Sequence, residues 1–369
     1  MLRSRSCWLA RVASVVLGLM VVLPATATQA EAASRTRHRV TTHTVKTSSR
    51  HYSATRASLR HMRVARAKAV AYARDARALE TPHFKMDASG QQVPDIRAEA
   101  AIIYNPVTHQ VVWEENANAQ RSIASITKVM TAVVFMEHAT DLSTEVEVLP
   151  TDVLHASTTY LRARDRITPD SLLHLMLIGS DNAAARVLAR VSPFGSAGFI
   201  DRMNAKAKEL HLENTHYADP CGLDPNNVSS AFDMAQLISF ASNDERISSV
   251  MRKSEDTVMT ARRTITVHST NKLLAGGEVP VRGGKTGFIR QAGYCLATLL
   301  QMPQGDPMAV VVLGARSNAG RFMETKHLFE WISDRTNSLL KPATSVAPKP
   351  DVVALPLLPA TPIPQGQQH

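Results

Sequence analysis

Cysteine is scarce in this sequence, and familiar metal-binding spacings are absent. Only three cysteines occur in 369 residues, with no paired C-x-x-C segments and no H-E-x-x-H segment, which argues against a zinc hydrolase. A chain of this length can bury a core without crosslinks, so we expect Cys221 and Cys295 to be buried free thiols rather than a disulfide. We expect no metal ion and no cofactor.

A nucleophile elbow of the form G-x-S-x-G is also missing. The histidines that could join a Ser-His-Asp triad, such as His216, His268 and His327, therefore lack the serine context that such a triad needs. This absence disfavours a hydrolase of the Ser-His-Asp type.

Long hydrophobic runs are lacking except at the amino terminus. Residues 12–23 are apolar, follow three arginines and precede the small residues ATATQAEAA, the pattern of an export signal. The run is shorter than the roughly 20 residues that a bilayer crossing needs. We predict a signal peptide over 1–32 whose cleavage also removes Cys7. The mature protein would then have no transmembrane span and would work outside the cytoplasm.

Positive charge is concentrated in the first quarter of the chain. Residues 1–95 carry 16 Lys and Arg against 5 Asp and Glu, whereas the rest is nearly balanced, with 26 against 27. The segment 33–95 is poor in large apolar residues, so we expect a disordered basic arm. Its residues 54–79 could become helical on an acidic envelope polymer or on lipid headgroups. Export makes nucleic acid an unsuitable partner.

Residues 96–340 have the pattern of one α/β domain. Two β-favouring runs, at 98–104 and 110–115, flank turn residues and predict a hairpin. Periodicity predicts helices at 169–177, 183–191, 198–210, 234–241 and 321–340, and strands at 264–267, 293–300 and 308–313. The Pro-rich residues 341–369 are expected to form a disordered tail.

A serine and a lysine stand three positions apart in the segment RSIASITKVMTA. Ser125 and Lys128 would share one face of the helix that begins there, so the amine could take the proton of the hydroxyl. A lysine can act as this base only if its pKa is lowered. The S-x-x-K pattern alone is common, and an ordinary serine beside a surface lysine is the simpler interpretation.

Two further motifs follow in a defined order. Ser180-Asp181-Asn182 lies at the joint between two predicted helices, and Lys285-Thr286-Gly287 precedes a predicted strand. The ordered set S-x-x-K, S-D-N, K-T-G is the signature of class A β-lactamases and penicillin-binding proteins. Three motifs in this order and in these settings are hard to obtain by chance.

The words around the motifs narrow this resemblance. RSIASITKVMTA, the stretch from NAKAKEL to FDMAQL, STNKLL and GGKTGFIRQAGYCLAT resemble the low-molecular-mass D-alanyl-D-alanine peptidases, and most of all the periplasmic D-alanyl-D-alanine endopeptidases. The resemblance covers about 98–340 and implies an antiparallel sheet flanked by helices, with a helical lobe beside it. Cys221 departs from the threonine usual in that family.

The resemblance and the chemistry together suggest a role for each motif residue. Ser125 would attack the carbonyl of a D-alanyl peptide bond in peptidoglycan and form an acyl-enzyme, with Lys128 as its base. Ser180, which could also be a simple helix cap, would pass a proton to the leaving amine. Asn182 would hold the substrate amide or steady Lys128.

The third motif would bind the substrate. Lys285, unless it is a surface lysine, would face the substrate carboxylate and help to keep Lys128 neutral. Thr286 would bind the same carboxylate, and Gly287 would let the substrate backbone approach. The N–H groups of Ser125 and Phe288 would form the oxyanion hole. β-Lactams are expected to inhibit covalently.

Several activities remain open within this reading. Carboxypeptidases of the group that the sequence resembles tend to have a β-rich second domain and a C-terminal amphipathic anchor, and neither is evident after residue 340. The resemblance therefore favours cleavage of crosslinks over removal of terminal D-alanine. A β-lactamase would need an E-x-x-L-N segment, which is absent between Asn182 and Lys285. A wall-binding protein without catalysis would not need intact motifs.

Overall fold

The computed structural model describes residues 49–139, 141–277 and 279–340. The predicted signal peptide over 1–32 and the Pro-rich tail over 341–369 lie outside these residues. Among the helices that are described, none combines the length and apolar character that a membrane crossing needs.

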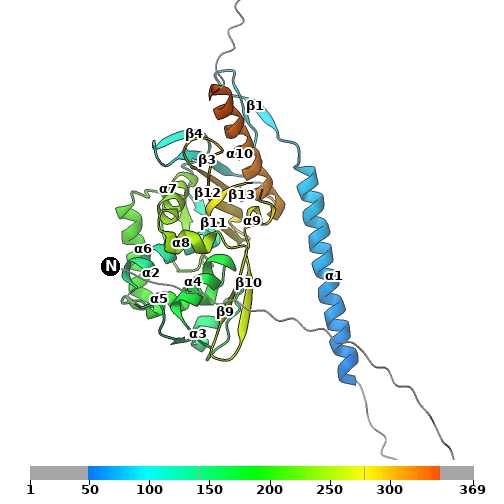
Figure 1. The fold of residues 1–369 in the computed structure, drawn as a ribbon, viewed down its shortest axis with the longest axis vertical. Helices are drawn as coiled ribbons and strands as arrows, with labels where there is room; N and C mark the ends of the chain where they lie inside the picture. Colours follow the sequence, from blue (N-terminus) through cyan, green and yellow to red (C-terminus); the bar gives the residue numbers. More distant parts are fainter. Residues whose placement is uncertain (1–48, 140, 278, 341–369) are drawn as a thin grey trace, which may run out of the picture. The chain divides into compact units, whose positions relative to one another are not determined.

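The domain is built on an antiparallel sheet with strand order β11-β12-β13-β3-β4 (Figure 1). Its strands are β3 (Ala100–Asn105), β4 (Gln110–Glu115), β11 (Val281–Ile289), β12 (Gly293–Leu300) and β13 (Met308–Ala315). The β3–β4 hairpin comes from the start of the domain and joins the later strands through the β3–β13 pair. The predicted hairpin and the predicted α/β fold with an antiparallel sheet are confirmed.

Alternate residues of the central strands enter two separate cores. Ile102 of β3 and Val311 of β13 face the larger core, which also contains residues of α2 and α7, whereas Ile103 and Val310 face a smaller core with α10. Successive side chains of a strand point to opposite faces, so a sheet covered on both sides has continuous apolar strands. This explains why β13 is buried along its whole length.

The helices cover both faces of the sheet and form a lobe beside it (Figure 1). The main helices are α2 (Thr127–His138), α4 (Pro169–Ile178), α5 (Asn182–Val191), α6 (Gly195–Glu209), α7 (Ala231–Ser242) and α10 (Asn318–Leu340). All six predicted helices are thus present, with ends shifted by a few residues. The helix α2 is almost entirely buried because it packs on α4, α5, α6 and α7, and α7 in turn packs on β3, β12 and β13 of the sheet.

Shorter elements connect these layers. They are β1 (Phe84–Met86), β2 (Gln92–Pro94), β5 (Arg121–Ser122), the 3-10 turn η1 (Ala124–Ile126), β6 (Val146–Glu147), α3 (Pro150–Val153), β7 (Arg166–Ile167), β8 (Val228–Ser229), α8 (Glu245–Met251), β9 (Glu255–Met259), β10 (Thr264–His268) and α9 (Leu273–Gly276). The strands among them form four two-stranded pairs, β1–β2, β5–β8, β6–β7 and β9–β10.

The segment expected to be a disordered arm contains regular structure. Residues Ser49–Ala78 form the helix α1, and β1 and β2 form a hairpin after it. The ring of Tyr72 packs against the small cluster of Leu273, Leu296 and Phe322, and the Nζ of Lys272 lies 3.4 Å from the centre of this ring. Contact with the domain supplies burial that the composition of the arm alone does not predict.

Candidate active site

Ser125 and Lys128 lie at the start of the buried helix. Ser125 is in η1, and Lys128 is in the first turn of α2 with none of its surface exposed. The Nζ of Lys128 lies 2.9 Å from the Oγ of Ser125. The i, i+3 placement predicted from the sequence therefore brings the amine into hydrogen-bonding contact with the hydroxyl.

The amine of Lys128 is held by two further oxygens. It donates to the Oδ1 of Asn182 at 2.6 Å and to the main-chain oxygen of Cys221 at 2.5 Å. Burial lowers the pKa of Lys128 to about 8, against the opposing attraction of Asp219 and Asp181. An amine with this pKa is partly neutral near pH 7 and can accept a proton.

The joint between α4 and α5 presents Ser180 and Asn182 to this pair. Asp181 caps α5 by accepting from the main-chain N–H of Ala184 at 2.9 Å, and it also accepts from the N–H of Tyr160 at 2.6 Å. Ser180 has a φ of 61°, an uncommon value for a residue other than glycine. The fixed joint thus holds a strained serine between the lobe and the sheet.

Lys285 lies behind Ser180 rather than on the wall of the cleft. Its Nζ donates to the Oγ of Ser180 at 2.9 Å and to the oxygen of Thr286 at 3.0 Å, and only 1% of the residue is exposed. Burial, followed by the charges of Lys128 and Arg321, lowers its pKa well below the usual range. The surface-lysine interpretation is therefore wrong.

The two lysine amines repel each other when both are charged. Burial is the largest cause that lowers the pKa of Lys128, and burial together with the charge of Lys128 lowers the pKa of Lys285. Because the repulsion is mutual, it also favours neutral Lys128 while Lys285 is charged. One positive charge is therefore easier to hold in this site than two.

Gly287 lies in close contact with the main chain of η1, a contact that the sequence does not predict. A Cβ at this position would lie 2.6 Å from the main-chain oxygen of Ile123 and 3.3 Å from the nitrogen of Ile126. The absent side chain therefore lets β11 lie against η1, which carries Ser125, whereas we expected it to admit the substrate backbone. Phe288 follows with 51% of its surface exposed, and its ring stacks on that of Tyr294.

A pocket of about 390 Å³ lies over these residues. Its walls include Ser125, Ser180, Asn182, Thr286, Gly287 and Phe288 from the predicted site, together with Thr270, Leu223, Arg290 and Arg321. The pocket thus joins all three motifs, with Lys128 and Lys285 beneath its floor. Within the described residues, no group of three His, Cys, Asp or Glu side chains could hold a metal ion.

Three contributors to the site were missed from the sequence. Arg321, only 6% exposed, donates to the oxygen of Gly287 at 2.9 Å, and burial lowers its pKa to about 10. Thr270 shares a 2.6 Å hydrogen bond with the hydroxyl of Thr286. Gly222 has a φ of 78°, and a Cβ there would lie 2.1 Å from the oxygen of Ala124. Thr270 lies in STNKLL and Gly222 in the stretch from NAKAKEL to FDMAQL, two segments that carry the resemblance but contain no local signal for a role in the site.

The two cysteines are free and buried, as predicted. The main-chain oxygen of Pro220 accepts from the hydroxyl of Thr131, and the main-chain oxygen of the next residue, Cys221, accepts from the amine of Lys128. Burial raises the pKa of both thiols. The main chain at Cys221, rather than its sulfur, contacts the amine of Lys128.

Comparison with known proteins agrees with this geometry. Residues 87–317 match the family described as D-alanyl-D-alanine carboxypeptidase, Peptidase_S11. The D-alanyl-D-alanine endopeptidase of Escherichia coli (strain K12) is 32% identical over 243 residues, covering 65% of this chain and 78% of that protein. The D-alanyl-D-alanine carboxypeptidase DacD of the same strain is 30% identical over 256 residues, covering 65% and 64%.

A solved structure supports the same assignment. The crystal structure of the Streptomyces K15 DD-transpeptidase aligns with a TM-score of 0.60 and 26% identity, covering 64% of this chain and 97% of that one. The resemblance stated from the motifs is confirmed. The chain belongs to the Peptidase_S11 family and is a serine-type D-alanyl-D-alanine peptidase.

Proposed function

We propose that this enzyme is a D-alanyl-D-alanine endopeptidase that cuts peptidoglycan crosslinks through an acyl-enzyme on Ser125. The observation that carries the chemistry is the buried Lys128, whose amine has a pKa of about 8 and lies 2.9 Å from the serine oxygen. The preference for crosslinks is supported by the endopeptidase relative, which is more similar than DacD and is matched over a larger share of its length.

In the proposed acylation, neutral Lys128 takes the proton of Ser125 while the serine oxygen attacks the carbonyl of a D-alanyl residue. The main-chain N–H groups of Ser125 and Phe288 would stabilise the oxyanion. As the C–N bond breaks, Ser180 would give its proton to the leaving amine. The hydrogen bond from Lys285 to Ser180 places a second amine where it can replace that proton.

Before deacylation, Lys128 would lose to solvent the proton that it took from Ser125, and Lys285 would regain one from solvent. A water molecule would then lose a proton to neutral Lys128 as its oxygen attacks the ester carbonyl, and Ser125 would leave with a proton returned by the same lysine. Asn182 would keep the amine in place, because its Oδ1 accepts from Lys128 while its Nδ2 donates to the oxygen of Ala156 at 2.7 Å.

Substrate binding would depend on the positive charge of Arg321, which lines the pocket. Arg321 and Thr286 line the pocket, whereas Lys285 is beneath it, so the arginine and the threonine are better placed to contact a carboxylate on the leaving residue. In a crosslink the leaving group is a whole stem peptide. The pocket leaves Arg290 exposed at its rim, where a longer substrate can extend.

The proposal includes a location. Peptidoglycan lies outside the cytoplasm, and the sequence pattern of 1–32 is that of an export signal, so we place the enzyme in the periplasm.

Labelling with a fluorescent penicillin tests the chemistry. Wild type should form a stable covalent adduct whose labelled peptide contains Ser125, and Ser125→Ala should form none. An adduct on another residue would contradict the proposed nucleophile. Rapid turnover of the drug would instead indicate a β-lactamase.

Crosslinked muropeptide dimers separate the peptidase activities, because an endopeptidase converts them to monomers and a carboxypeptidase does not.

A further inference from the structure

The helix α1 has one face that contacts the domain and another that is free. Within 62–79, the partly buried positions are Tyr72, Asp75, Ala76 and Leu79. Their spacing of three, one and three residues places them on one side of a helix. Tyr72 packs on the cluster that contains Phe322, and Leu79 borders a small cleft with Arg97 and Glu324. This side anchors the helix to the domain.

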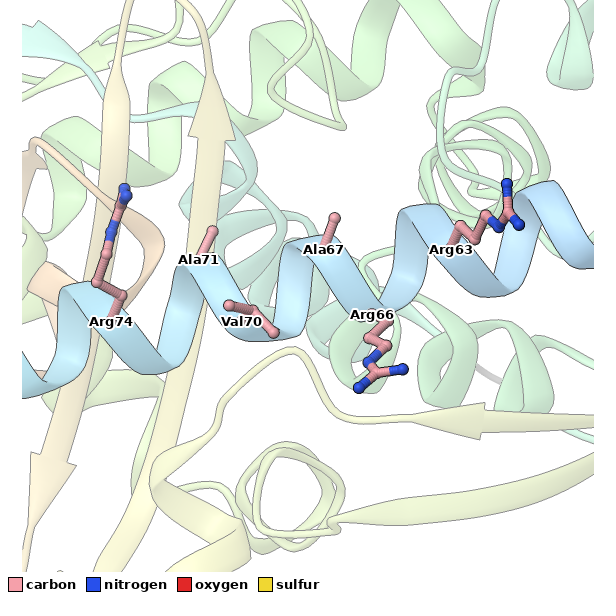
Figure 2. A pocket seen from close by; sticks show the side chains of 6 residues that line it. All are labelled: Arg63, Arg66, Ala67, Val70, Ala71 and Arg74. Carbon is pink, nitrogen blue, oxygen red and sulfur yellow. The ribbon is translucent and has the colours of Figure 1, made fainter.

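Arginines occupy the other side. Arg63, Arg66 and Arg74 lie on the exposed part of α1, with Val70 and two alanines among them. Figure 2 shows Arg63 and Arg74 pointing toward one edge of this surface and Arg66 toward the other. Arg77, three residues after Arg74, continues the row. We call Arg63, Arg66, Arg74 and Arg77 the arginine face of α1. At about 1.5 Å per residue it spans roughly 20 Å along the helix.

The positive charge of this face is almost uncompensated. Among the residues from Arg60 to Ala78, six are Lys or Arg and one, Asp75, is acidic. The ion pair of Arg74 with Asp75 is 3.6 Å long, and the arginine side chain in it is 81% exposed, so it contributes little. In the part of the chain that the structure describes, the other three members of the face form no ion pair. Such a row attracts a polymer with repeated negative charges.

The apolar residues of α1 argue against a membrane as the partner. Val70 is 61% exposed, but it lies between Arg66 and Arg74 on the same face. A helix that lies in a membrane interface needs an apolar stripe separated from its charged side. The arginine face interrupts any such stripe around Val70, so a polyanion in water fits it better than a bilayer does.

We propose that the arginine face of α1 binds the free carboxylates of peptidoglycan strands and holds the enzyme on its polymeric substrate. The proposal rests on the proposed function, which makes this carboxylate-bearing polymer the substrate. Guanidinium groups bind carboxylates with two parallel hydrogen bonds. Several weak contacts on one polymer raise the local concentration of the active site at its substrate without altering the chemistry.

Binding to purified sacculi tests the proposal in the full chain. A Ser125→Ala background keeps the wall intact and makes the measurement independent of catalysis. In this background we compare the parent protein with the quadruple variant R63Q, R66Q, R74Q and R77Q. The control, R164Q, K208Q, R262Q and R282Q, removes the same charge from exposed positions outside α1 and outside the pocket.

The parent and the control should sediment with sacculi, and their binding should fall as salt rises to about 0.3 M. The α1 variant should bind about tenfold more weakly. Sacculi whose carboxylates have been converted to amides should bind all three proteins equally weakly. With Ser125 restored, the α1 variant should cleave soluble muropeptide dimers at the parent rate.

Equal binding of the α1 variant and the control would overturn the proposal, as would undiminished binding of the parent protein to amidated sacculi. Sedimentation with phosphatidylglycerol vesicles but not with sacculi would show that the partner is a membrane. Failure of the proposed function appears separately, as dimers that are not cleaved by an enzyme that still binds sacculi through the arginine face.

Discussion

At the scale of single residues, the central feature is Lys128, whose pKa is lowered by burial to about 8. Because the pKa of Lys128 is about 8, the neutral and reactive form should become dominant above pH 8. The rate of penicillin acylation should therefore rise with pH and be about a hundredfold higher on the plateau than at pH 6. Stopped-flow acylation across this range measures it, and a flat profile between pH 6 and 8 would contradict the assignment.

The source of the shift can be tested through Lys285. Lys285→Met keeps the bulk but removes the amine that contacts Ser180. Acylation should slow, because the proton donor behind Ser180 is lost, while the midpoint of the pH profile should stay near 8, because burial sets the pKa of Lys128. If the midpoint instead moves toward the usual lysine range, the charge of Lys285 is the cause after all.

The close approach at Gly287 gives a stability prediction. A Cβ there meets main-chain atoms of Ile123 and Ile126, which cannot rotate away as a side chain can. Gly287→Ala should destabilise the protein by about 1–3 kcal/mol and slow acylation by displacing η1. Urea unfolding and penicillin labelling measure both effects.

Gly198→Ala is the matched control, because a Cβ there would lie 3.4 Å from the nearest atom, an ordinary distance, within the helix α6. It should leave acylation unchanged and should not lower stability, since alanine is favoured over glycine in helices by about 1 kcal/mol. Equal behaviour of the two variants would mean that β11 and η1 do not need their close contact.

At the scale of elements, Asp181 fixes the joint between α4 and α5 and so positions its two neighbours, Ser180 and Asn182, which line the pocket. Asp181 accepts from Ala184, Tyr160 and Thr159. Asp181→Ala leaves these donors without their acceptor and should cost about 2–4 kcal/mol. It should also slow acylation at least tenfold, because Ser180 and Asn182 lose their fixed positions.

Thr168→Ala provides the comparison for this prediction. Thr168 caps α4 by accepting from the N–H of Ser171 at 3.2 Å, at the end of the helix away from Ser180. Its loss should cost about 1 kcal/mol and leave acylation at the parent rate. An Asp181→Ala protein that folds and acylates normally would show that the joint does not position the site.

The anchoring of α1 is a second property at this scale. Tyr72→Ala removes the ring that packs against the domain and lies under the amine of Lys272. Hydrogen exchange in 62–78 should become faster, while β3 in the centre of the sheet should be unaffected. Val70→Ala, on the exposed face, should change neither. Equal protection of α1 in both variants would contradict the anchoring role of Tyr72.

At the scale of the whole molecule, local patterns predicted the fold and the motifs but not the contacts between distant segments. Periodicity and turn residues predict the β3–β4 hairpin and the helices, and the three motifs predict a site whose residues the fold brings together around one pocket. Arg321 and Thr270 were missed because they meet Gly287 and Thr286 only after folding. Lys285 was expected on the surface of the cleft, yet packing of the lobe against β11 places it beneath Ser180.

The basic segment 33–95 also makes contacts with distant residues that its local sequence does not predict. Its composition suggested disorder, because the segment by itself lacks enough apolar surface to fold. One aromatic residue, Tyr72, packs against residues some 200 to 250 positions away in the sequence, and no local pattern indicates that contact. The same helix then presents its arginines on the side away from the contact.

We propose that this domain cleaves crosslinks in preference to terminal D-alanine. Purified crosslinked muropeptide dimers and monomeric pentapeptides, incubated in separate reactions with the mature protein, give kcat/KM for the two activities by chromatography of the products. Dimers should be converted to monomers with the higher kcat/KM, and Ser125→Ala should convert neither substrate. Loss of D-alanine from pentapeptides with intact dimers would contradict it.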